Sequence, residues 1–119
     1  TLAPLAQWLG LAATKRNGVL IVGGGRWSVD LARKLKDNAV PVLIVDSNWN
    51  DLRDARAAGI PVHHGEILSE TVEYTLDLGG YGTLIAATDN DAYNTLVMND
   101  YAFDFGRQNI FQIAPALRK

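Results

Sequence analysis

The amino-acid sequence predicts a Rossmann-like α/β domain with a doubly wound parallel sheet of about five strands, ordered 3-2-1-4-5. Three observations predict it. Short β-branched apolar runs alternate with segments of helical periodicity, a glycine turn follows the first run, and Asp46 ends the second run. Strands joined by single helices must be parallel neighbours with right-handed crossovers. A ligand of such a sheet binds at the carboxyl ends of the strands, beside the first and fourth.

The strands are expected where the apolar runs lie, at residues 19–22, 42–45, 60–63, 83–87 and 110–113. A first helix fills the gap after the first run, because Ser28, Leu31, Ala32 and Leu35 recur at helical spacing. Each later helix is followed by a glycine. These helices are expected at residues 48–58, 69–78 and 90–105. The last has apolar residues on most sides, which favours burial on two faces, one of them against a partner subunit.

The chain has 119 residues, the usual size of one domain. We expect residues 1–17 to be a lead-in segment or linker and residues 18–119 to be the domain. The chain begins at Thr1 without a methionine, which suggests a processed protein or a fragment of a longer one.

Composition removes several classes of function. The net charge is -2, so no electropositive surface for nucleic acid is implied. The absence of cysteine excludes disulfides, thiolate metal sites and a cysteine nucleophile. No signal peptide opens the chain, and its apolar runs are far shorter than a membrane span. The sequence therefore favours a soluble domain of a reducing cytoplasm.

The strongest motif is the turn after the first strand, a G-x-G-x-x-S form of the dinucleotide-binding fingerprint. Its residues are Gly23, Gly24, Gly25, Arg26, Trp27 and Ser28. The first glycine permits a tight turn, the second lets a phosphate approach the backbone, and the helix N-terminus stabilises negative charge. The alternative is a glycine-rich connection that binds nothing.

Three side chains of this turn have two interpretations each. Arg26 can pair with a phosphate or remain a solvated surface arginine. Trp27 can shield the loop or contact another subunit, although a local hydrophobic cap is favoured. Ser28 replaces the third glycine, which normally allows close packing of helix and strand, and serine is small enough to do the same.

Asp46 is the expected acceptor for the ribose hydroxyls of an adenine nucleotide. Its carboxylate would repel a 2′-phosphate by about 4 kcal/mol at 4 Å for an effective dielectric of 20, and Ser47 and Asn48 supply no cation. NADP is therefore disfavoured. The alternative role of Asp46 is to cap the second helix. Trp49 either stacks on adenine or, by preference, is an exposed or interface residue.

The third strand ends in His63-His64-Gly65-Glu66-Ile67. Adjacent strand residues point to opposite faces, so the two histidines cannot both bind one metal ion. We predict nucleotide contacts from Gly65, Glu66 and Ile67. Glu66 meets the adenine edge or, equally, complements a helix dipole.

Small and capping residues follow the fourth strand, and small residues leave space for a ligand over the sheet. Ala87, Thr88 and Asp89 are predicted to line the site, and Asn94 faces the same mouth if a helix starts at Asn90. Capping alone explains Asp89 to Asp91 equally well.

Taken in order, these motifs resemble the TrkA-N domain, also called RCK-N or KTN, a cytoplasmic nucleotide-binding module of bacterial potassium channels, transporters and antiporters. The likeness covers about residues 18–113. It is carried by Gly23-Gly24-Gly25-Arg26, Asp46, Gly65-Glu66 and the A-A-T-x-x-D-x-x-N-like stretch at residues 86–94. There are two departures from the family pattern: Ser28 replaces a glycine and Glu66 replaces the usual aspartate.

Residues 1–11 resemble the segment after the last membrane helix of NhaP-type sodium/proton antiporters that carry such a domain. The resemblance implies a regulatory domain, dimeric, at the inner face of the cell membrane as part of a larger membrane protein. It would bind NAD(H), AMP, ADP or ATP, gate cation transport and perform no chemistry.

Two other functions stay open. One is the cofactor domain of an NAD-dependent oxidoreductase, although the chain ends just beyond the fifth strand without a substrate domain. The other is a scaffold that has lost its ligand because Trp27 fills the loop.

Overall fold

The computed structural model describes residues 17–70, 72, 76 and 78–113. Its sheet has five parallel strands in the order β3-β2-β1-β4-β5, which confirms the predicted fold and strand order. The strands are β1 (Gly18–Val22), β2 (Val42–Asp46), β3 (Val62–His64), β4 (Tyr81–Ala86) and β5 (Ile110–Gln112). Their ends differ from the predicted runs by one or two residues, as is usual for element boundaries.

The helices are α2 (Arg26–Asp37), α3 (Arg53–Ala57) and α5 (Asp91–Phe105), with two short 3-10 helices, η1 (Trp49–Leu52) and η2 (Arg107–Asn109). The single helix expected at residues 48–58 is therefore a tight 3-10 turn followed by a short α-helix. Asn48 explains the tight start, because its side chain accepts a hydrogen bond from the Asn50 N–H at 2.9 Å.

Two expectations fall on residues that the structure largely leaves undescribed. The lead-in of residues 1–17 is described only at its last residue, and the helix expected at residues 69–78 lies mostly outside the described residues. The fourth predicted helix is α5, which begins one residue later than expected. Asn90 is its N-cap, and the Asn90 side chain accepts from the Tyr93 N–H at 3.0 Å.

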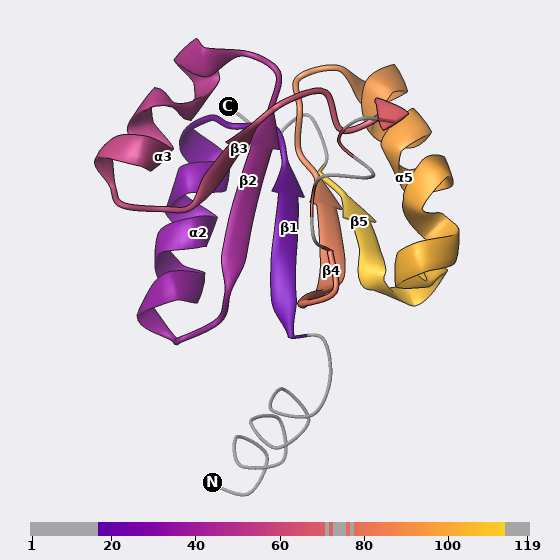
Figure 1. Cartoon of the computed structure of the whole chain (residues 1–119), viewed down its shortest axis with the longest axis horizontal. Helices are drawn as coiled ribbons and strands as arrows, with labels where there is room; N and C mark the ends of the chain where they lie inside the picture. Colours follow the sequence, from indigo (N-terminus) through magenta and orange to yellow (C-terminus); the bar gives the residue numbers. More distant parts are fainter. Residues whose placement is uncertain (1–16, 71, 73–75, 77, 114–119) are drawn as a thin grey trace, which may run out of the picture.

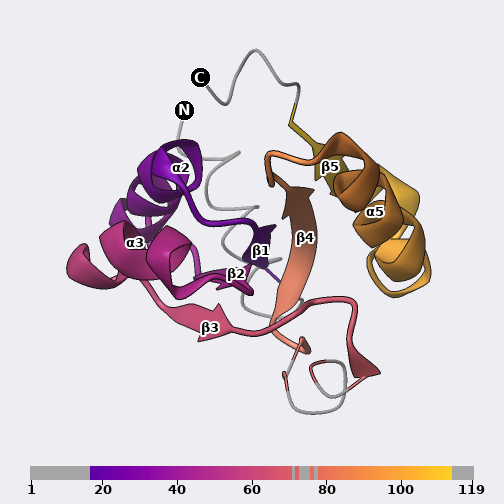
Figure 2. The ribbon, with the colours of Figure 1, turned by 90° about the horizontal axis from the view of Figure 1, so that it is seen from above.

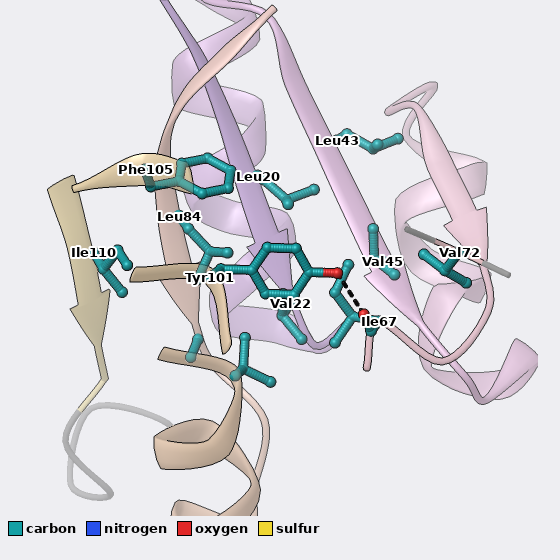
Figure 3. Close-up of a cluster of buried hydrophobic side chains, with 12 residues drawn as sticks. Leu20, Val22, Leu43, Val45, Ile67, Val72, Leu84, Tyr101, Phe105 and Ile110 are labelled. Carbon is teal, nitrogen blue, oxygen red and sulfur yellow. Dashed lines mark hydrogen bonds between the residues drawn. The ribbon is translucent and has the colours of Figure 1, made fainter. Parts of the chain in front are cut away.

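The helices cover both faces of the sheet. Figures 1 and 2 show α2 and α3 on one face and α5 on the other. Successive strand residues point to opposite faces, so Leu20 and Val22 join the α5 side of the core while Val19 and Ile21 join the α2 side. Figure 3 shows the α5 side, where Tyr101 reaches across the cluster toward Ile67.

Helix α5 buries one side and exposes apolar residues on another. Val97 and Tyr101 are buried in the core, whereas Phe103 is 98% exposed and Leu96 is 57% exposed. No helix in the described part of the chain combines the length and apolar character that crossing a membrane requires.

Candidate functional site

In the described part of the chain, a cavity of about 570 Å³ opens at the carboxyl ends of β1, β2 and β4. Every predicted site residue except Asn94 lines it. These are Gly23, Gly24, Gly25, Arg26, Trp27, Ser28, Asp46, Ser47, Gly65, Glu66, Ile67, Ala87, Thr88 and Asp89. Residues far apart in the sequence therefore meet at one place, the crevice where the direction of winding reverses.

The cavity has two walls. The glycine-loop wall consists of residues 23–28, Asp46 and Asp51 of η1. The α5 wall consists of Glu66, Ile67, Thr88, Asn90 and Tyr93. The sequence-based list missed some lining residues: Val22, Val45, Asn48, Asp51, Asn90 and Tyr93.

Close main-chain contacts shape the glycine-loop wall. Gly23 has φ of 112°, and a Cβ there would lie 2.8 Å from the Thr88 nitrogen. A Cβ on Gly24 would lie 2.3 Å from the Asp51 carbonyl oxygen. The packing of η1 on the loop therefore requires glycine at the second position, and the approach of a phosphate to the same backbone stays a prediction.

Asp46 ties the loop to the end of β2. Its Oδ2 accepts from the Gly24 N–H at 2.7 Å, and its Oδ1 accepts from the Asn48 N–H at 2.9 Å. A carboxylate has about four lone-pair positions, so each oxygen retains capacity for another donor such as a ribose hydroxyl. Asp46 thus organises the loop and still presents acceptors to the cavity.

The N-terminus of α2 has no internal partner of the usual kind. Gly25 occupies the N-cap position without a side-chain hydrogen bond, and no acidic residue lies in the first turn. The first N–H groups of a helix lack intrahelical acceptors, and the helix dipole is positive there. Because residues 25–28 line the cavity, an anion is the group that this wall can bind.

Ser28 supports the same turn from inside. It is buried, and its Oγ donates to the Gly23 carbonyl at 2.6 Å. The serine in place of the third glycine therefore fits between helix and strand and fastens the loop to the helix that follows it. Trp27 is half-buried, packs on the α2 side of the core and also lines the cavity, while Arg26 is exposed at its rim.

Carboxylates dominate the charge of the cavity. Burial raises the pKa of Asp51 above its usual 3.8, and the charge of Asp46, a hydrogen bond with that residue and the charge of Asp89 raise it further. The described lining thus contains Asp46, Asp51, Glu66 and Asp89 against one guanidinium, that of Arg26. Asp51 lies on η1, where the chain turns back toward the cavity. No motif in the sequence around Asp51 predicts that it lines the cavity.

Asn94 lies behind the cavity and not in its lining. It is fully buried, its Oδ1 accepts from the Thr88 N–H at 3.1 Å and from the Thr88 hydroxyl, and its Nδ2 donates to the Thr88 carbonyl at 3.1 Å. Asn90 caps the helix, and the first turn then places Tyr93 at the mouth and Asn94 beneath Thr88. Asn94 therefore fixes the exit of β4.

Tyr93 and Glu66 close the α5 wall. The Tyr93 hydroxyl donates to Glu66 Oε1, and both residues line the cavity. Burial raises the pKa of Tyr93, and the hydrogen bond and charge of Glu66 raise it further, so the hydroxyl keeps its proton as a donor. This link joins the segment after β3 to α5.

The histidines and Trp49 lie outside the cavity lining. The His64 ring stacks on Trp49 with centroids 4.3 Å apart, and Arg56 lies 5.0 Å from the Trp49 ring centroid on this exposed surface. No group of three or more His, Cys, Asp or Glu residues within the described ranges is arranged to hold a metal ion.

Comparisons with known proteins agree with the fold. The sequence pattern of the TrkA-N domain matches residues 19–110. The fold is similar to that of "SirC, precorrin-2 dehydrogenase", with a TM-score of 0.54 and 20% identity, over 84% of this chain and 45% of that one. The chain therefore spans less than half of that protein. No curated protein matches the chain.

Proposed function

Because the chain belongs to the TrkA-N domain family, we propose that this nucleotide-binding Rossmann domain senses an adenine nucleotide and regulates a membrane cation transporter. The observation that carries the proposal is the pairing of two features across one cavity. The uncapped start of α2 suits a phosphate, and Asp46 on the neighbouring strand suits the ribose attached to it.

The charges of the cavity support a dinucleotide over a triphosphate. Four carboxylates and one arginine line it, and like charges about 4 Å apart repel by about 4 kcal/mol at an effective dielectric of 20. A diphosphate bridge carries less negative charge than the triphosphate of ATP. We therefore propose NAD(H) as the preferred ligand, with AMP and ADP weaker, ATP weakest of the adenylates, and NADP rejected by Asp46.

Regulation of transport requires that the nucleotide bind two domain arrangements with different affinities. Phe103 and Leu96 on α5 offer an exposed apolar surface for a second copy of the domain, which favours a homodimer. In this proposal the domain acts at the cytoplasmic face of the membrane, attached to the transport unit of a larger protein such as an NhaP-type sodium/proton antiporter. It performs no chemistry.

Calorimetry with NAD, NADH, AMP, ADP, ATP and NADPH tests the binding proposal. A ligand at 100 times its dissociation constant should also add about 2.7 kcal/mol to the free energy of unfolding. Asp46→Ala should weaken every riboside ligand by about tenfold or more, because its ribose acceptor is lost. Asp30→Ala, on the exposed side of α2, is the matched control. The proposal would be refuted if calorimetry detected no binding of any of these ligands.

The alternative function is the cofactor domain of an NAD-dependent oxidoreductase. An assay for turnover distinguishes it from the proposed regulatory function. Steady oxidation of NADH by this chain with a small carbonyl compound would favour that rival. Reversible binding without turnover, together with a change in subunit association on adding NAD, would favour regulation.

A further inference from the structure

Two tyrosine hydroxyls of α5 hold the segment that follows β3. Tyr101 donates to the Ile67 carbonyl at 2.5 Å inside the core, as Figure 3 shows, and Tyr93 donates to Glu66 at the cavity. One bond is buried and purely internal. The other lies where a ligand would be, so it can influence what the cavity accepts.

Glu66 is held by one oxygen only. Its Oε1 accepts from the Tyr93 hydroxyl and, at 3.3 Å, from the Leu68 N–H. Its Oε2 makes no hydrogen bond within the described part of the chain. An ionised carboxylate is an acceptor and never a donor, so Oε2 offers the cavity a fixed acceptor.

The position of Glu66 suits the base of the nucleotide. Asp46 pairs in register with His64 on the adjacent β3, and Glu66 follows two residues later. A ribose bound at Asp46 would therefore direct its base toward the β3 edge, where Glu66 lies. An acceptor there stabilises the exocyclic amine of adenine and repels the carbonyl that replaces this amine in hypoxanthine.

We propose that Tyr93 is a positioning residue that orients Glu66, so that the cavity selects a purine bearing an exocyclic amine over one bearing a carbonyl. The inference rests on the proposed nucleotide-binding function and adds the residue pair that sets base specificity. Tyr93 need not touch the ligand, because its effect passes through the Glu66 carboxylate.

Calorimetry with NAD and nicotinamide hypoxanthine dinucleotide tests this directly. The unaltered chain should bind NAD about tenfold more tightly than the analogue. Tyr93→Phe should lose most of that preference, because only the 3.3 Å hydrogen bond from the Leu68 N–H then restrains Glu66. Glu66→Gln should also lose it, because a side-chain amide can donate to the carbonyl of hypoxanthine.

Tyr101→Phe is the matched control, since it removes the other tyrosine hydroxyl from the same segment. It should lower stability and leave the ratio of the two dissociation constants unchanged. A purely structural role of Tyr93 would weaken the binding of both dinucleotides by the same factor and leave the ratio of the dissociation constants unchanged. A positioning role changes the ratio.

Three results would overturn the inference. Equal binding of both dinucleotides by the unaltered chain would remove base selection while leaving the nucleotide-binding function intact. A preference that survives in Tyr93→Phe would remove the role of Tyr93. Failure of both dinucleotides to bind would remove NAD as a ligand and this inference with it, and the proposed function would then depend on the outcome with AMP, ADP and ATP.

Discussion

The two walls of the cavity are built by different kinds of contact. In the glycine-loop wall the backbone of η1 lies so close to Gly24 that a methyl group would meet Asp51 at 2.3 Å. In the α5 wall, side chains do the joining: Asn94 holds Thr88, and Tyr93 holds Glu66. The first wall therefore combines a close main-chain approach with the hydrogen bonds of Asp46 and Ser28, whereas hydrogen bonds between side chains and the chain around them join the second.

One cavity can thus combine a constant part and a variable part. Main-chain amides and a helix terminus suit the phosphate and ribose that all adenine nucleotides share. Side-chain hydrogen bonds can be exchanged one residue at a time, so they suit the part of the ligand that differs. Four substitutions test the contrast.

The largest effect is expected at Gly24→Ala. The new methyl group overlaps the Asp51 carbonyl, so η1 or the loop must move, at a cost of about 3 kcal/mol in the free energy of unfolding. Denaturant unfolding measures it. Gly80→Ala is the control, because a Cβ at Gly80 has no neighbour within 4 Å. A change below about 0.5 kcal/mol at Gly24 would mean that the close approach is not real.

Asn94→Ala should show that the α5 wall depends on polar groups. The substitution leaves the N–H and carbonyl of Thr88 without their partner, which should cost about 2 kcal/mol. Nucleotide affinity should fall as well, because Thr88 lines the cavity. Thr95→Ala, one residue along and exposed, should change stability by less than about 0.5 kcal/mol. Equal stability of the two variants would contradict the assignment.

Ser28→Ala tests whether a side chain also matters in the glycine-loop wall. It removes the bond from Ser28 Oγ to the Gly23 carbonyl and should cost about 1 kcal/mol. Thermal unfolding of the free domain gives this value. An unchanged midpoint would show that the Ser28 hydroxyl adds nothing to the main-chain contacts and the Asp46 hydrogen bond that hold this wall.

The smallest effect is expected from Asp51→Asn, which removes one charge from the cluster around Asp46. Folding raises the pKa of Asp51. The residue therefore contributes favourably to the free energy of unfolding below about pH 3.8, and this contribution is lost as the pH rises through the raised pKa. Asn does not titrate. At neutral pH the free energy of unfolding of the variant should therefore exceed that of the unaltered chain by at most about 1 kcal/mol.

Unfolding measured from pH 3 to pH 8 checks the sign of this effect. The gain should shrink toward acid pH, where Asp51 is protonated in both the folded and the unfolded chain. A gain that grows on acidification would contradict the shift. Asp54→Asn, on the exposed part of α3, supplies the control for a general loss of charge.

The order of the strands and most of the cavity lining follow from the amino-acid sequence alone. Apolar alternation and the glycine turn fix which segments are strands, and parallel connections then bring Gly23, Asp46 and Thr88 to the same edge of the sheet. These inferences need only local patterns and one rule of handedness.

The contacts that hold the lining in place become visible only in the folded chain. The contacts of Gly24 with Asp51, of Asn94 with Thr88 and of Tyr93 with Glu66 depend on where η1 and α5 begin, and one residue of shift turns a helical side chain by about 100°. Helix α5 turns Asn94 into the core beneath Thr88 and turns Tyr93 to the cavity. Periodicity locates a helix, but capping and packing set its rotation, and that rotation selects the residues that meet a ligand.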